Sequence, residues 1–226
     1  IYTLSLHDAL PIYLPMNIQR SEVENPVYDM TFEDIHTDAA QAQKAADTIL
    51  EALETAKRPV IMLGHGVDSS ASQRELIQFA RKRQIPIITS VLAKSVLGYE
   101  HPLNFGCIGG AYGHRYANMI ANAKSDLLLC FGISLCTRQI GTKVHEFAKG
   151  AKIIRVDIDS CNLQRDIHEN GANEVKLQAE TGVVIDCLSR AAVQKPDEYR
   201  EWLNVCNEIK ENLQAVDDQT PERYPN

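Results

Sequence analysis

The sequence lacks the local signals of several common protein classes. No apolar run approaches the roughly 20 residues that a helix needs to cross a bilayer, and no basic region precedes an apolar segment as in a signal peptide. The six cysteines form no C-x-x-C pair, so neither a zinc site nor a disulfide set is indicated. We interpret them as reduced thiols of a cytoplasmic protein.

The motifs of a complete catalytic centre are also missing. The chain has no G-x-S-x-G elbow, no Walker-type lysine loop and no His/Cys cluster with the spacing of metal ligands. Its net charge of −7, with acidic and basic residues interspersed, provides no basic stripe for nucleic acid. We therefore predict no catalytic residue and no metal ligand in this chain, and neither a nucleic-acid nor a membrane partner.

From residue 38 onwards, short apolar runs alternate with segments of helical periodicity. Asp38 is suited to cap a helix that ends near Ala56. Strands are expected at PVIMLGHG, 85–90, 126–132, 152–159 and 174–177, and helices at 70–83, 114–123, 143–147, 182–193 and 197–213. Strands that are apolar throughout and separated by helices are typical of a parallel sheet covered on both faces. The predicted fold is a doubly wound, Rossmann-like α/β sheet of about six strands flanked by helices.

The two ends of the chain differ in character from this central part. Residues 1–12 do not join sensibly to the segment that begins at Tyr13, and we interpret them as a non-native string; the alternative is an ordinary N-terminal strand and turn. Residues 13–37 are expected to be the end of a preceding domain, with a strand end and a proline-containing linker. The α/β domain is assigned to 38–195, and 196–226 to a helix and connector.

Candidate ligand-binding residues come directly after the predicted strands, because ligands of open parallel sheets bind beyond the carboxyl ends of the strands. The glycine loop 105–113 is expected to fold over the same crevice. If the strand persists to Asp159, Asp157 and Asp159 point to opposite faces, which makes them a poor acid/base pair. No strict G-x-G-x-x-G is present, so the glycines are equally consistent with tight strand–helix turns. The candidates are Gly64, His65, Gly66, Ser90, Val91, Gly132, Arg138, Asp157 and Ile158.

The order of segments resembles the central domain of the acetolactate synthase and pyruvate oxidase group of thiamine-diphosphate-dependent enzymes. The resemblance runs from Tyr13 to Leu188 and rests on LPMNIQ, RPVIMLGHGV, IPIITSVLAKSVLGYEHPLNFGCIGGAYGHRYAN, SDLLLCFGISLCTRQIG and KIIRVDID taken together. In that family a first domain holds the glutamate that activates the cofactor, and a third holds a Gly-Asp-Gly…Asn motif for Mg²⁺ and diphosphate. This sequence contains neither motif.

The resemblance implies a piece of a longer enzyme that is inactive alone. The intact enzyme would use thiamine diphosphate and Mg²⁺ to decarboxylate a 2-keto acid and join it to a second carbonyl, as a transferase or lyase. It would be a homo-oligomer, dimer or tetramer, to which the middle domain contributes a scaffold and subunit contacts.

Some members of the family bind FAD in this domain, and the candidate residues fall at positions resembling their flavin contacts. His65, however, replaces the middle glycine of a triple-glycine turn. Ser134 and Cys136 stand where flavin-binding relatives have arginine and aspartate. Losing an arginine–phosphate contact removes roughly 1.5–3 kcal/mol. FAD is therefore possible here, but tight binding is not expected.

Two other functions fit the same pattern. The first is a stand-alone nucleotide-binding module in which the strand ends hold NAD, ADP or coenzyme A. The second is a non-catalytic domain that buries apolar faces against partner subunits.

Overall fold

The computed structural model describes residues 16–22, 36–68, 72–110, 112–192 and 197–218. By its internal contacts the chain divides into two units, 1–36 and 37–226. In the first unit Met16–Gln19 form a helical turn, α1, where we expected the end of a strand. The turn closes its own hydrogen bond, from Arg20 N–H to the carbonyl of Met16 at 3.2 Å, whereas a strand needs a partner. The string 1–12 lies outside the described residues.

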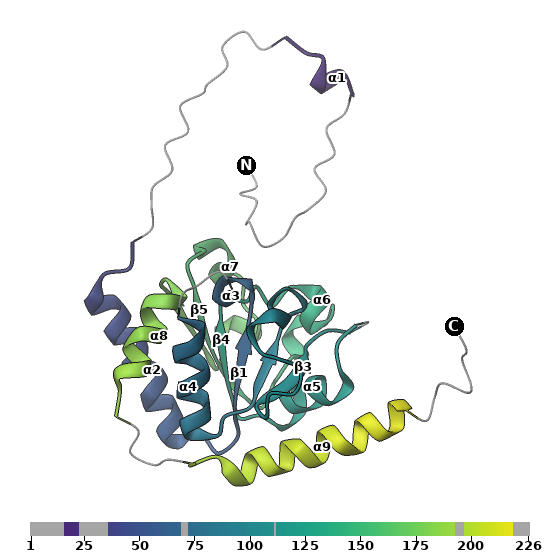
Figure 1. The fold of residues 1–226 in the computed structure, drawn as a ribbon. Helices are drawn as coiled ribbons and strands as arrows, with labels where there is room; N and C mark the ends of the chain where they lie inside the picture. Colours follow the sequence, from purple (N-terminus) through teal and green to yellow (C-terminus); the bar gives the residue numbers. More distant parts are fainter. Residues whose placement is uncertain (1–15, 23–35, 69–71, 111, 193–196, 219–226) are drawn as a thin grey trace. The chain divides into compact units, whose positions relative to one another are not determined.

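Six parallel strands form one sheet in the second unit, in the order β3-β2-β1-β4-β5-β6 (Figure 1). β1 and β4, at the centre, are buried along their whole length, as apolar runs predict for a sheet covered on both faces. The predicted doubly wound parallel α/β fold is confirmed. The strands are β1 (Pro59–Leu63), β2 (Ile87–Thr89), β3 (Asn104–Cys107), β4 (Leu127–Phe131), β5 (Lys152–Asp157) and β6 (Glu174–Gln178).

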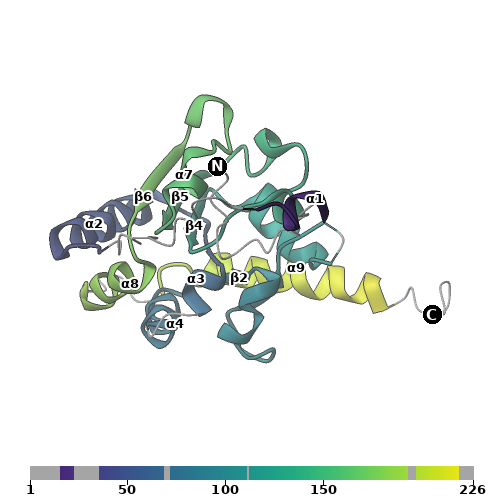
Figure 2. The same cartoon turned by 90° about the horizontal axis from the view of Figure 1, so that it is seen from above.

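One face of the sheet is covered by three helices, with α8 (Thr181–Arg190) between α2 (Ala39–Thr55) and α4 (Gln73–Arg83) (Figures 1 and 2). The Asp38 carboxylate accepts the N–H of Gln41 at 2.7 Å, which confirms it as the cap of α2. Right-handed crossovers place the connections from β3 to β6 on the other face. These connections contain α5 (Arg115–Met119), η2 (Ile120–Lys124), α6 (Thr137–Ile140), η3 (Val144–Glu146), α7 (Ser160–Gln164) and η4 (Glu169–Gly171).

Several predicted boundaries are wrong. The glycine loop supplies β3, an edge strand, so residues 105–107 do not fold over the crevice. The expected helix at 143–147 is a single 3₁₀ turn, and the helical turn α6 was not predicted. β5 ends at Asp157, and Asp159 instead caps α7, with its carboxylate accepting the N–H of Cys161 at 2.8 Å.

The last helix, α9 (Arg200–Asp218), crosses the amino ends of the strands (Figure 1). Three side-chain donors fix it to backbone carbonyls there: Tyr199 to Leu53 at 2.6 Å, Trp202 to Pro59 at 2.9 Å, and Lys210 to Asn104 at 3.0 Å. Val205, on the same helix, is 43% exposed. α9 is therefore packed as part of this domain. Within the described ranges, no helix has both the length and the apolar character needed to traverse a bilayer.

Candidate functional site at the switch point of the sheet

The site lies where the strand order reverses. β1 and β4 are neighbours in the sheet, yet the chain leaves β1 towards β2 and β3 and returns to β4 before continuing to β5 and β6. The carboxyl ends of parallel strands share one edge, so the candidates after β1, β2, β4 and β5 are gathered at this switch point. Two further turns belong to this edge: α3 (His65–Asp68) and the 3₁₀ helix η1 (Val91–Val96).

The glycines at this edge are explained by contact between two backbones. A Cβ atom on Gly64 would lie 1.9 Å from the carbonyl oxygen of Gly132, and one on Gly66 would lie 2.9 Å from the Cα of Gly132. Gly132 itself has φ +54° and would place a Cβ 2.7 Å from the Cα of Gly66. The turns after β1 and β4 therefore pack directly on each other, and side chains are excluded between them.

The backbone donors of these turns are used within the protein. Gly64 donates to the carbonyl of Phe131 at 2.9 Å, and Gly66 donates to the carbonyl of Gly132 at 3.2 Å. Gly132 donates to Val156 at 2.9 Å. In addition, α3 is only four residues long, too short to contribute a substantial helix dipole. These three amides are thus not presented to an anion in the way that a phosphate-binding turn presents its amides.

The remaining candidates differ in exposure. Ser90 is buried, and its N–H donates to the carbonyl of Leu63 at 2.7 Å. Val91 and Ile158 are 41% and 36% exposed apolar side chains at the ends of β2 and β5. His65 is exposed. The edge therefore offers apolar surface at two strand ends, with Ser90 turned into the fold.

Asp157 organises the loop after β5. Its side chain is 4% exposed, and its carboxylate accepts the N–H of Asp159 at 2.9 Å. The strand was expected to continue through Asp159, which would place the two aspartates on opposite faces, but it ends at Asp157. The two carboxylates form successive local caps rather than an acid/base pair.

Arg138 and Arg165 contribute the positive charge of the β4–α6 loop. Arg138 lies on α6 and is exposed. Arg165, which sequence reasoning missed, donates from Nη2 to the carbonyls of Ser134 at 2.5 Å and Leu135 at 2.7 Å. Leu135 is buried with φ +50°, a conformation that these contacts help to hold. Arg165 therefore fastens this loop to the segment after α7.

A buried ion pair holds the backbone of Arg165 in place. Arg155, in the middle of β5, is 2% exposed and donates to the carbonyls of Asn162 and Arg165, the latter at 2.7 Å. Its Nη1 lies 3.6 Å from the carboxylate of Glu174. Glu174 accepts the N–H groups of Ile167 and His168, each at 2.6 Å. An arginine inside the apolar run KIIRVDID was the signal that could have predicted this network.

Burial makes the thiol of Cys130 unreactive. Cys130, in β4, is buried, and this burial raises its pKa to about 12. Across the part of the chain that the structure describes, no group of three or more His, Cys, Asp or Glu side chains is placed to hold a metal ion. The arrangement suits a rigid scaffold with a partly apolar edge.

Comparison with known proteins identifies the family. Residues 46–188 match the family described as thiamine pyrophosphate enzyme, central domain, a range that runs from within α2 to within α8 and contains all six strands. The chain belongs to this family.

This central domain is also similar to named members of the family. It is 38% identical over 152 residues to the acetolactate synthase isozyme 1 large subunit of Escherichia coli K12, covering 63% of this chain. It is 30% identical over 171 residues to a probable acetolactate synthase large subunit of Methanocaldococcus jannaschii, covering 75% of this chain. It is 26% identical over 213 residues to a glyoxylate carboligase of Escherichia coli O157:H7, covering 88%. The matches span 26%, 27% and 33% of those relatives.

Proposed function

We propose that the chain is the central scaffold domain of a thiamine-diphosphate-dependent enzyme that decarboxylates a 2-keto acid and joins the product to a second carbonyl. One observation carries the proposal: the region that matches the family's central domain contains the whole doubly wound sheet, and the switch-point residues are engaged in packing and loop support. Thiamine diphosphate with Mg²⁺ supplies, when bound, the electron sink for decarboxylation. In this proposal both are held by residues outside this chain.

The role of this chain's own residues is to hold the edge of the sheet rigid. The glycine contact between the turns after β1 and β4 and the Arg155–Arg165 network fix the loops that come after the central strands. A rigid edge gives neighbouring domains a constant surface against which to position substrate. The proposed substrate is a 2-keto acid, and the proposed assembly is a homo-oligomer.

We further propose that this domain does not hold FAD tightly. The amides of Gly64, Gly66 and Gly132 are used internally, and Ser134 and Cys136 offer no charge to a diphosphate. Two exposed cations lie beside the crevice, Arg138 and Arg165, and Arg165 already donates to the carbonyls of Ser134 and Leu135. This charge is too little for tight diphosphate binding alone. The purified protein is expected to show no flavin absorbance; stoichiometric flavin would contradict this. Titration with NAD, ADP or coenzyme A tests the nucleotide-binding alternative in the same sample.

The proposed activity is tested on the complete reading frame that contains this domain. The protein encoded by that frame is expected to release CO₂ from pyruvate or another 2-keto acid only when thiamine diphosphate and Mg²⁺ are added. The 226-residue chain, shown to be folded by circular dichroism, is expected to release none. Lack of cofactor-dependent CO₂ release across a panel of 2-keto acids by the complete protein would contradict the proposal.

A further inference from the structure

The outer surface of the three-helix face has an acidic row on one side. Asp47, Glu51 and Glu54 are exposed on α2 at positions i, i+4 and i+7, a spacing that aligns them along one side of a helix. Within the described part of the chain none of the three has an ion-pair partner; Asp47 accepts a hydrogen bond from Gln43 at 2.8 Å. This row is called the α2 acidic row.

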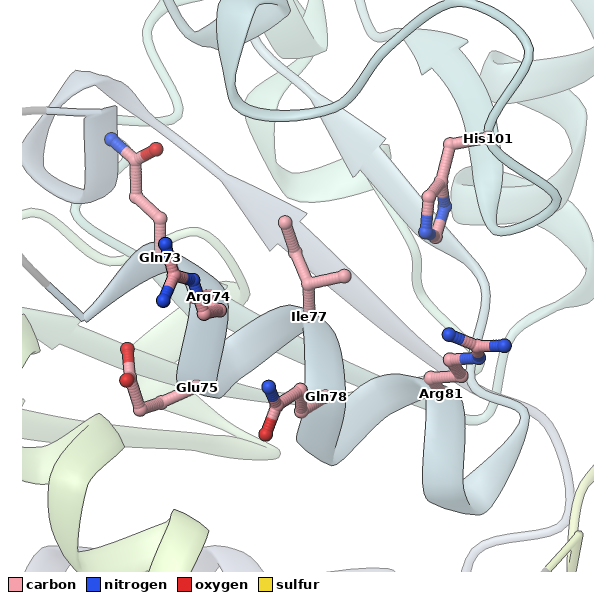
Figure 3. Close-up of a pocket in the computed structure, with 7 residues that line it drawn as sticks. All are labelled: Gln73, Arg74, Glu75, Ile77, Gln78, Arg81 and His101. Atoms are coloured by element: carbon pink, nitrogen blue, oxygen red, sulfur yellow. The ribbon is translucent and has the colours of Figure 1, made fainter.

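The other side of the same face has a basic groove. Arg74, Gln78 and Arg81 are exposed on α4 with the same i, i+4, i+7 spacing. They line a groove of about 610 Å³ between α4 and the loop that carries His101 (Figure 3). We call it the α4 basic groove.

The groove is lined by two guanidinium groups, those of Arg74 and Arg81, and by one carboxylate, that of Glu75, so its net charge is positive. His101 accepts the N–H of Leu103 at Nδ1, at 3.2 Å, and its pKa is lowered by burial and by the charge of Arg81. The imidazole is therefore neutral at physiological pH. Arg74 and Arg81 have no ion-pair partner among the residues that the structure describes. About 10 Å of helix separates these two cations, the distance that also separates Asp47 from Glu54.

The two charged rows cannot meet within one molecule, because α8 lies between α2 and α4. The part of α8 turned away from the sheet carries the half-buried Val183 and the Asp186 carboxylate, which accepts the Ser72 hydroxyl at 2.7 Å. α8 also carries the exposed Arg190, so the centre of the face has one charge of each sign and no net charge. A strip that is acidic apart from the exposed Lys44, a strip without net charge and a basic strip lie next to each other across the surface.

We propose that this face binds the same face of a second copy of the chain. α2, α4 and α8 all run opposite to the strands, so two arrangements of a two-fold axis within the interface are possible. An axis in the interface plane and perpendicular to the helices would place the α2 acidic row of one copy against the α2 acidic row of the other. An axis along α8 places the α2 acidic row of each copy in the α4 basic groove of the other, twice per dimer. The charge pattern selects the second arrangement.

The size of the face indicates a weak dimer. Three helices of this length cover on the order of 500 Å², less than the roughly 800 Å² per partner of a standard interface. A dissociation constant on the order of 10–100 µM is expected for this face alone. Because the pairs are exposed charges, raising the salt from about 50 to 500 mM should weaken the dimer at least about fivefold.

Charge reversal tests the proposal by sedimentation of the 226-residue chain at about 10–500 µM. The E51K/E54K variant and the R74E/R81E variant should each dissociate at least tenfold more readily, because each places like charges together. An equimolar mixture of the two should restore the dimer, since each variant then meets its complement at both contacts. The matched control is E208K/E211K, which reverses two exposed glutamates at the same spacing on α9 and should leave dimerisation unchanged.

Circular dichroism establishes that each variant is folded before sedimentation. A wild-type chain that stays monomeric up to about 500 µM would overturn the proposal. So would a dimer that is indifferent to both reversals, or a mixture of the two variants that fails to associate. None of these results depends on catalysis, so the proposed function is tested separately.

Discussion

At the scale of single residues, the structure gives a reason for the switch-point glycines that the sequence pattern does not contain. The pattern Gly64-His65-Gly66 predicts a turn at the end of a strand, and the structure has one. Glycine is needed there because the backbone of Gly132, nearly 70 positions further along, leaves no room for a Cβ atom. A local sequence pattern cannot predict this long-range contact. The same applies to Arg165, whose acceptors lie 31 and 30 positions away.

The substitution Gly64→Ala is expected to destabilise the fold by at least about 3 kcal/mol, because its Cβ must displace the carbonyl of Gly132. Gly98→Ala is the control, since no heavy atom lies within 4 Å of a Cβ there, and its effect should stay within about 0.5 kcal/mol. Urea unfolding followed by circular dichroism measures both. Equal midpoints for the two variants would show that the backbone contact is not tight.

At the scale of elements, the strands and helices with strong apolar patterns were predicted, and several short elements without one were missed. β1 and β4 are continuous apolar runs, and α2 has both periodicity and a cap. β3 was missed because its four residues, NFGC, include a glycine and alternate in burial at the edge of the sheet. α9 was predicted as a helix, but its attachment to the amino ends of the strands depends on carbonyls of other elements.

Replacing Tyr199 by Phe should weaken this attachment by about 1 kcal/mol, since the hydroxyl donates to the carbonyl of Leu53. Burial, and then the charge of Glu198, raise the pKa of Tyr199 above its usual value of 10. A raised pKa contributes stability that is fully present below about pH 10 and is lost as the pH rises further. The wild type should therefore lose more stability than the variant above pH 10.

Thermal unfolding between pH 8 and 11 measures this difference. Tyr99→Phe serves as the control, because Tyr99 is 69% exposed and its loss should leave the pH profile unchanged. Cys130 and Cys206, whose pKa values are also raised by burial, contribute the same alkaline loss to all three proteins. Parallel profiles for wild type and Tyr199→Phe would contradict the role assigned to this hydroxyl.

At the scale of the whole molecule, the fold class was predictable because a parallel sheet covered on both faces imposes apolar strands along the entire domain. The position of the candidate site was predictable from the fold, since switch points are set by strand order. Which candidates would face a ligand was not predictable: Ser90 and Asp157 are turned into the fold, while His65, Val91, Arg138 and Ile158 are exposed.

The central claim is that this domain is a scaffold and that thiamine diphosphate is bound by other parts of the enzyme. Calorimetric titration of thiamine diphosphate with Mg²⁺ tests it most directly, with the folded 226-residue chain and the complete protein measured side by side. We expect saturable binding to the complete protein and no heat of binding with the chain. Stoichiometric binding to the chain alone would contradict the claim.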